Sequence, residues 1–169
     1  MRKTLSFVVL AIILQACGTM PYVPTQYALR DGLIASIDAN GPTTVSNAQP
    51  ATDPVIVYSY GGTKLQSDLK AITETMVQQT NGEIAKNAKV KAGGKPKTIA
   101  LKVNSLLSVY GFYSWKSSIV FDATLGDGKV VSKTVTHGSG SLQQDLNGCI
   151  AEGVMNLLND PQVRAYMAQ

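Results

Sequence analysis

Residues 117–136 read SSIVFDATLGDGKVVSKTVT, and this stretch decides the fold class. Ile119, Phe121, Ala123 and Leu125 alternate with polar or less apolar neighbours, which predicts a strand with one buried face. A second strand-like run, KVVSKTVT at 129–136, follows directly. The dipeptide Asp127-Gly128 between the two runs is typical of a tight hairpin with a primed turn. The stretch therefore predicts an antiparallel β-hairpin.

Further strands are predicted upstream of this hairpin. Residues 98–109 form a long alternating run, with one face predicted to consist of Ile99, Leu101, Val103, Leu107 and Val109. The segment VIVYSY at 55–60 is rich in β-branched and aromatic residues, which favours a strand. Alternation at 33–38 predicts a first strand, and the Pro-, Asn- and Thr-rich residues 39–54 predict a loop.

Two amphipathic helices are predicted to cover this sheet. Gly61-Gly62 is followed by Thr63 and Gln66 at capping-box spacing, so one helix is expected to begin there. Its apolar stripe would contain Leu65, Leu69, Ile72 and Met76. The second helix is expected after GSGS, with Ser141 and Gln144 as its capping box, and Asp160-Pro161 should cap a short C-terminal helix. The buried stripe of this second helix is predicted to comprise Leu142, Leu146, Cys149, Ile150, Val154, Leu157 and Leu158.

These elements predict an α+β two-layer sandwich. An antiparallel sheet of about five strands would carry two helices on one face. One face of such a sheet is exposed to solvent, so the apolar face must be covered by other elements. Residues 28–169 are expected to form one domain. Residues 18–27, GTMPYVPTQY, contain two prolines and are predicted to be an extended tether that, with residue 17, precedes this domain.

Residues 1–16, MRKTLSFVVLAIILQA, have the pattern of a signal peptide. Arg2 and Lys3 supply a positive start, and residues 5–14 are apolar except for Ser6. A bilayer core of about 30 Å needs roughly 20 helical residues, so this run is too short to span it. Its size is that of a signal-peptide core.

The leader ends in Leu14-Gln15-Ala16-Cys17, which resembles the lipobox of bacterial lipoproteins. A thiol is the nucleophile that accepts diacylglycerol, and a small residue before it lets the signal peptidase close on the chain. The resemblance implies that residues 1–16 are removed and that Cys17 carries covalent diacylglycerol and an N-acyl chain such as palmitate. Several acyl chains hold a protein stably, whereas one holds it only reversibly. With Gly18 rather than Asp after Cys17, the implied destination is the outer membrane.

Composition narrows the function further. The chain has 15 basic and 11 acidic residues, and two of the basic ones lie in the leader, so the remainder is nearly balanced. This gives no support to nucleic-acid binding. With Cys17 assigned to lipid, Cys149 has no disulfide partner and is expected to be a buried, inert thiol.

Residue types that carry chemistry are sparse. His137, the only histidine, could pair with Ser139 or Ser141 as in a hydrolase, but those serines stand where a helix N-cap is required. Backbone N–H groups of the same GSGS segment could cradle a phosphate, although no lysine or acidic partner accompanies it. One histidine and one free cysteine make no zinc site, and the acids Asp122 and Asp127 form no tight pair. We therefore expect no enzyme, no metal and no other cofactor.

Two surface features favour binding. Tyr110, Phe112, Tyr113 and Trp115 crowd the end of the long strand, where aromatic rings could grip a protein, a glycan or a membrane surface, or could instead cap the core. Lysines with no acid between them could contact anionic lipid or an acidic partner, or form an ordinary solvated surface. This second set comprises Lys86, Lys89, Lys91, Lys95 and Lys97, followed by Lys102.

The lipobox, the strand LKVNSLLSVYG, the hairpin and the terminal helix together resemble the small Gram-negative outer-membrane lipoproteins of the YajG type. The resemblance implies a lipid-anchored lipoprotein with an α+β domain in the periplasm, and Cys17 is the one functional residue it transfers. We expect a non-enzymatic interaction or accessory module with a protein partner, serving envelope assembly, transport or a surface machine. A lipid- or glycan-binding carrier is the alternative, and it would need an apolar cavity.

Overall fold

The structure, a computed structural model, describes residues 18–169. Cys17 and the predicted signal peptide lie outside the described residues. The elements in chain order are β1 (Thr19–Pro21), β2 (Ile37–Ala39), β3 (Thr43–Asn47), β4 (Pro54–Tyr60), β5 (Thr63–Asp68), α2 (Leu69–Asn87), β6 (Ala88–Val90), β7 (Lys97–Tyr110), β8 (Trp115–Leu125), β9 (Val130–Ser139), α3 (Leu142–Leu158) and α4 (Pro161–Ala168).

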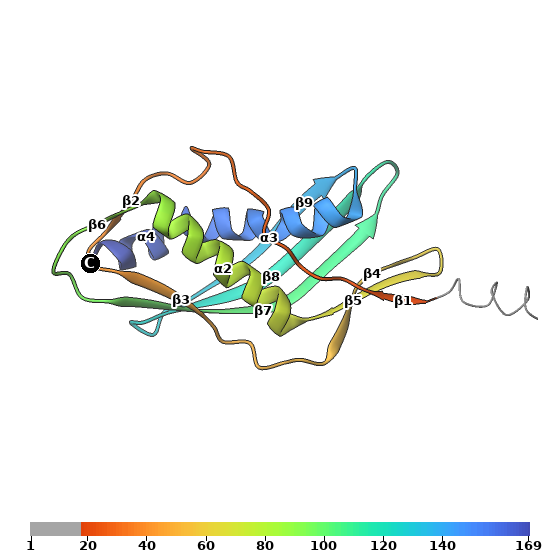
Figure 1. Cartoon of the computed structure of the whole chain (residues 1–169), viewed down its shortest axis with the longest axis horizontal. Coiled ribbons are helices and arrows are strands. Elements are labelled where there is room, and N and C mark those ends of the chain that lie inside the picture. Colours follow the sequence, from red (N-terminus) through yellow and green to blue (C-terminus); the bar gives the residue numbers. More distant parts are fainter. Residues whose placement is uncertain (1–17) are drawn as a thin grey trace, which may run out of the picture.

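The described chain is an α+β domain in which α2 and α3 cover one face of a sheet (Figure 1). The sheet has seven strands in the order β1-β5-β4-β7-β8-β9, with β3 also paired to β7. It is mixed: β4–β5, β7–β8 and β8–β9 are antiparallel, whereas β1–β5, β3–β7 and β4–β7 are parallel. The α+β class is therefore confirmed. The predicted antiparallel sheet of about five strands differs in detail, because the sheet has seven strands and some of them pair in parallel.

The predicted helix start at Thr63 is wrong, because residues 63–68 form β5. Gly61 and Gly62 have φ of 57° and 83° and make a two-residue turn between β4 and β5. Positive φ at both positions is what a type I′ hairpin turn requires, and glycine adopts it without strain. The helix α2 begins instead at Leu69, where the Asp68 carboxylate accepts the backbone N–H of Ala71 at 2.7 Å.

The region predicted as a first strand and a long loop also differs. Of the strand expected at 33–38, only residues 37 and 38 are in a ladder. Together with Ala39 they form β2, which pairs in parallel with β6 in a separate two-stranded sheet. Inside the expected loop, β3 pairs in parallel with the start of β7, from Thr43 opposite Lys97 to Asn47 opposite Leu101. Parallel pairing to a distant strand leaves no local turn signal in the sequence. The loop-like composition of residues 39–54 therefore hid the strand β3.

A β-bulge in β7 reverses which residues face the helices. The β7–β8 register shifts between Val103 and Ser105, so Asn104 is the extra residue. After it, Leu106 is 3% exposed and Leu107 is 50% exposed. The predicted inward positions of Leu107 and Val109 were therefore wrong, since a one-residue slip moves every later side chain to the other face.

Side chains satisfy the backbone of β7 at the bulge. Here β3 has ended, and β4 has not yet begun to pair. The Val103 carbonyl accepts the Gln49 side-chain amide at 2.6 Å, and the Val103 N–H donates to the Thr73 hydroxyl of α2 at 3.1 Å. Buried backbone groups need such partners, so Gln49 and Thr73 make the bulge tolerable.

The β8–β9 hairpin exists as predicted, but its turn is of another kind. Gly128 has φ of 87°, whereas Asp127 has no positive φ, so the turn is not the primed type. The Gly128 N–H donates to the Leu125 carbonyl and the Leu125 N–H donates to the Lys129 carbonyl, each at 2.8 Å. This is a three-residue loop closed by a glycine.

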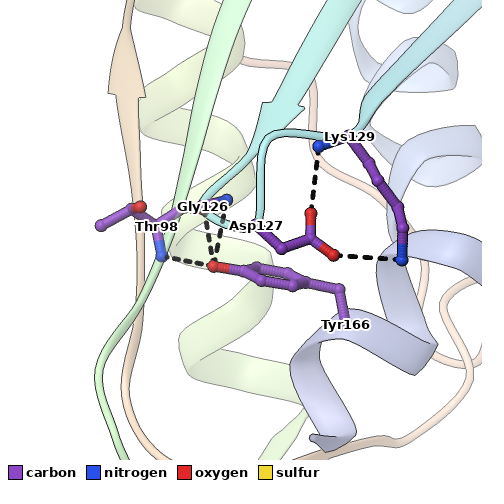
Figure 2. Close-up of polar contacts among 5 residues, drawn as sticks. All are labelled: Thr98, Gly126, Asp127, Lys129 and Tyr166. Carbon is purple, nitrogen blue, oxygen red and sulfur yellow. Dashed lines mark hydrogen bonds and ion pairs between the residues drawn. The ribbon is translucent and has the colours of Figure 1, made fainter.

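Tyr166 ties α4 to this end of the sheet, as Figure 2 shows. Its hydroxyl donates to the Thr98 carbonyl and accepts the N–H groups of Thr98 and Gly126, each at 3.1 Å. A Cβ at position 126 would clash with this hydroxyl, which explains the glycine. Beside it, Asp127 pairs with the Lys129 side chain at 3.2 Å.

The two C-terminal helices begin differently. Ser141 occupies the N-cap position of α3 but its side chain makes no capping bond, so the predicted capping box with Gln144 is wrong. The predicted Asp160-Pro161 cap is confirmed, because the Asp160 carboxylate accepts the N–H groups of Gln162 and Val163 at 2.8 and 3.2 Å. Burial raises the pKa of this carboxyl, but hydrogen bonds from Lys133 and from these amides lower it overall.

The segment predicted as a tether is instead held against the domain. Thr19–Pro21 is β1, paired in parallel with β5, and the Tyr22 N–H donates to the Gln66 carbonyl at 2.7 Å. The Tyr22 ring is buried, and its hydroxyl donates to the Asn147 side chain of α3 at 2.7 Å. Burial raises the pKa of this phenol. The ordered domain therefore begins at the start of this segment, with β1 at Thr19.

We expect Tyr22→Phe to lower the free energy of unfolding by about 1 kcal/mol, because it deletes one buried hydrogen bond and leaves the Asn147 oxygen with one donor fewer. Urea unfolding and hydrogen exchange of the Tyr22 amide would measure the effect. The matched control is Tyr27→Phe, since Tyr27 is exposed and its hydroxyl makes no hydrogen bond within residues 18–169. Equal effects of the two substitutions would contradict this account of the N-terminal segment.

Candidate functional site

Three strands bring aromatic side chains together at one end of the sheet. Tyr110 and Trp115 are cross-strand partners at the open ends of β7 and β8, with ring centroids 4.9 Å apart. Strand β4 joins β7 through Tyr58 and Ser108, which brings the ring of Tyr60 to 5.3 Å from that of Tyr110. Phe112 and Tyr113 occupy the turn between β7 and β8, 5.8 Å apart. We call this set the aromatic end: Tyr60, Tyr110, Phe112, Tyr113 and Trp115.

Most of these rings face solvent. Phe112 is 93% exposed and Tyr113 is 89% exposed, and Tyr60 and Tyr110 are exposed as well. Trp115 alone is half-buried and packs against the core. Three of the four rings singled out from the sequence therefore lie outside the core, an arrangement that favours binding over core capping. A shallow hollow of about 380 Å³ lies between the two turns, lined by Tyr60, Tyr110, Gly111 and Phe112.

Tyr60 was missed from the sequence. It belongs to the site only because β4 runs parallel to β7 and ends at the same level. The available signal was Gly61-Gly62, a two-residue hairpin dipeptide between strand-like runs. The strand predicted at 55–60 already ended at Tyr60, and taking the dipeptide as a hairpin would have placed Tyr60 beside a turn, although not next to β7.

The lysines do not join the aromatic end. Lys97 begins β7 and Tyr110 ends it, so at about 3.3 Å per strand residue they are roughly 40 Å apart. Lys89 and Lys91 lie in and just after β6, and Lys95 and Lys97 line a hollow of about 370 Å³ with the C-terminal Gln169. Lys86 forms an ion pair with Asp31 at 2.6 Å.

A buried polar cluster beneath the aromatic end was also missed. Asp145 is 0% exposed, and its carboxylate accepts the hydroxyls of Ser108, at 2.9 Å, and Ser117. Its second oxygen is buried without a partner among the described residues. Asp145 lies in the first turn of α3, where the helix dipole favours a negative charge. One feature of the sequence could have indicated that Asp145 is buried: it lies on the apolar stripe of the helix, three residues after Leu142.

The residues considered for catalysis are not brought together. Within the described residues no hydrogen bond joins His137 to Ser139 or Ser141; the Ser139 hydroxyl accepts the backbone N–H of Ser141 instead. Cys149 is fully buried, and burial, with the Asp145 carboxylate adding to it, raises the pKa of its thiol to about 12. Such a thiol is protonated at neutral pH and unreactive.

Within residues 18–169, no group of three or more His, Cys, Asp or Glu could hold a metal ion. None of the helices in this part of the chain combines the length and the apolarity needed to cross a membrane.

No family model matches the chain, and no curated protein matches it. The family resemblance inferred from the sequence therefore stays a prediction.

Proposed function

We propose that the protein is a lipid-anchored accessory module of the cell envelope, acylated at Cys17 and held to the outer membrane with its domain in the periplasm. It makes contacts through the aromatic end and catalyses no reaction. The observation that carries the proposal is the exposure of Phe112 and Tyr113, at 93% and 89%, on a turn next to the tilted ring pair of Tyr110 and Trp115. Large exposed aromatic rings mark contact surfaces, since leaving them in water is unfavourable.

The packing of the core favours this proposal over a lipid- or glycan-binding carrier. A carrier needs an apolar cavity of roughly 300 Å³ or more that encloses most of its ligand. In the described domain, the space between the helices and the sheet is occupied by side chains that are fully buried. They include Ile72, Met76, Ile119, Phe121, Leu146, Ile150 and Val154.

A photoreactive phenylalanine analogue at position 113 tests the contact role in living cells. We expect adducts with envelope components at this position and far fewer at position 124, because Thr124 is exposed on the uncovered face of the same hairpin. Mass spectrometry of the labelled peptide identifies what is captured. Adduct yields no higher at position 113 than at position 124 would contradict the proposal.

A further inference from the structure

The aromatic end lies beside the place where the described chain begins. Thr19 of β1 is opposite Lys64 of β5, and Tyr60 and Thr63 are partners across the adjoining turn. Figure 1 shows the start of β1, the β4–β5 turn and the β7–β8 turn at the same end of the sheet. The tilted contact between the rings of Tyr60 and Tyr110, whose centroids are 5.3 Å apart, connects the two turns.

Covalent geometry keeps an anchor on Cys17 close to this end. Cys17 precedes Thr19 by two residues, and two residues of chain span at most about 7 Å. Since β1 is hydrogen-bonded to β5, the domain cannot move away from the anchor on a free tether. A bilayer that holds acyl chains at Cys17 therefore lies within reach of the rings of Phe112 and Tyr113.

The surface chemistry of this end suits a phospholipid interface. Tyrosine and tryptophan are enriched at the boundary between headgroups and acyl chains, where an apolar ring and a polar group are both satisfied. The segments that meet here, 18–22, 58–64 and 108–118, contain no Asp or Glu. They contain the exposed lysines Lys64 and Lys116, which anionic headgroups attract. Asp145, which bonds Ser108 and Ser117 beneath this end, is fully buried.

We propose that the aromatic end is a membrane-docking site whose partner is the phospholipid surface of the leaflet that holds the acyl chains. Phe112 and Tyr113 enter the interface, and Lys64 and Lys116 face the headgroups. Docking fixes the orientation of the domain, so that Lys95 and the other lysines at the far end of β7 point away from the bilayer. The inference rests on the proposed acylation of Cys17.

A bilayer fits the observations better than a protein partner does. Strong aromatic contacts between proteins are enclosed in well-packed pockets that exclude water. Phe112 and Tyr113 are 93% and 89% exposed on the turn between two strands, so a pocket that encloses them would have to be supplied entirely by the partner. A fluid interface accommodates rings in this position without a complementary pocket.

Tryptophan fluorescence in vesicles tests the docking. Trp115 is the only tryptophan, so Trp115→Phe/Tyr113→Trp places one reporter on the turn. The control Trp115→Phe/Lys129→Trp places it on the β8–β9 turn at the other end of β8. Each full-length acylated protein is reconstituted into vesicles of phosphatidylethanolamine and phosphatidylglycerol with acyl chains brominated near the headgroup. We expect most of the fluorescence to be lost at position 113 and little at position 129.

The outcomes separate the two proposals. Adding Phe112→Asp to the first reporter should restore much of the fluorescence, because a carboxylate is expelled from an apolar interface. Protein that floats with the vesicles but is quenched no more at position 113 than at 129 would overturn the docking and leave the lipid anchor standing. Protein that does not float would overturn the anchor, and the docking with it.

Discussion

Replacing Cys17 with serine is expected to move nearly all of the protein from the membrane fraction to the soluble fraction. Acyl chains contribute about 0.8 kcal/mol per buried CH₂, so two or three chains hold a protein almost permanently. The exposed rings of the aromatic end cannot substitute for them, because a fully buried Phe side chain gains only about 1.5–3 kcal/mol. Loss of the acyl chains should therefore abolish sedimentation with membranes even though the aromatic end is unchanged.

The design needs one control, because an unprocessed leader could itself hold the variant in a membrane. A second variant combines Cys17→Ser with an ordinary secretory signal peptide in place of residues 1–16. Fractionation and immunoblotting of both variants measure the distribution. Retention of the second variant in the membrane fraction at the wild-type level would contradict an anchor at Cys17.

Leu106→Ala is expected to lower the free energy of unfolding by about 2–5 kcal/mol, whereas Leu107→Ala should cost less than about 1 kcal/mol. The two leucines are adjacent, but the bulge at Asn104 leaves Leu106 3% exposed and Leu107 50% exposed. Truncating a buried leucine removes apolar surface that folding would bury away from water, and it leaves a cavity in the core. Truncating the exposed one does neither to a comparable extent.

Urea unfolding of the soluble Cys17→Ser protein, followed by Trp115 fluorescence and circular dichroism, measures both substitutions. Coincident transitions with the two probes would justify the two-state treatment. Without the bulge, the alternation of residues 98–109 would bury Leu107 and expose Leu106. A larger cost for Leu107→Ala than for Leu106→Ala would therefore contradict the register described here.

Local patterns predicted the elements whose partners are close in the sequence. The hairpin of β8 and β9, the strand β7 and the helix α3 follow from alternation or from an apolar stripe. The pairings that failed are not local: the parallel partners of β3 and β7 are 54 positions apart in the chain, and those of β1 and β5 are 45 positions apart. A parallel pair has no turn of its own, so neither strand could be recognised from composition.

The errors at Thr63 and Leu107 have a common cause. Thr63 and Gln66 match a capping box, but Gly61-Gly62 closes a hairpin first and draws both residues into β5. Leu107 continues the apolar alternation, but Gln49 and Thr73 supply the hydrogen bonds that let β7 bulge before it. In each case hydrogen bonds outside the local pattern decided the structure: those to β4 across the turn at Thr63, and those from Gln49 and Thr73 before Leu107.

The candidate site was predictable in part. Four of its five rings stand together in the sequence, and their crowding indicated a contact surface. The fifth ring, Tyr60, and the closeness of all five to the start of β1 depend on the order of strands in the sheet. The lysines were predicted as a separate feature, and those from Lys86 to Lys97 lie away from the aromatic end, with Lys97 at the other end of β7.

Mass spectrometry of the protein purified from its native membrane tests the central claim most directly. The account predicts an N-terminal peptide that begins at Cys17 and carries diacylglycerol on sulfur and a fatty acid on the α-amino group. An N-terminal peptide that retains residues 1–16, or one that begins at Cys17 without fatty acids, would contradict it.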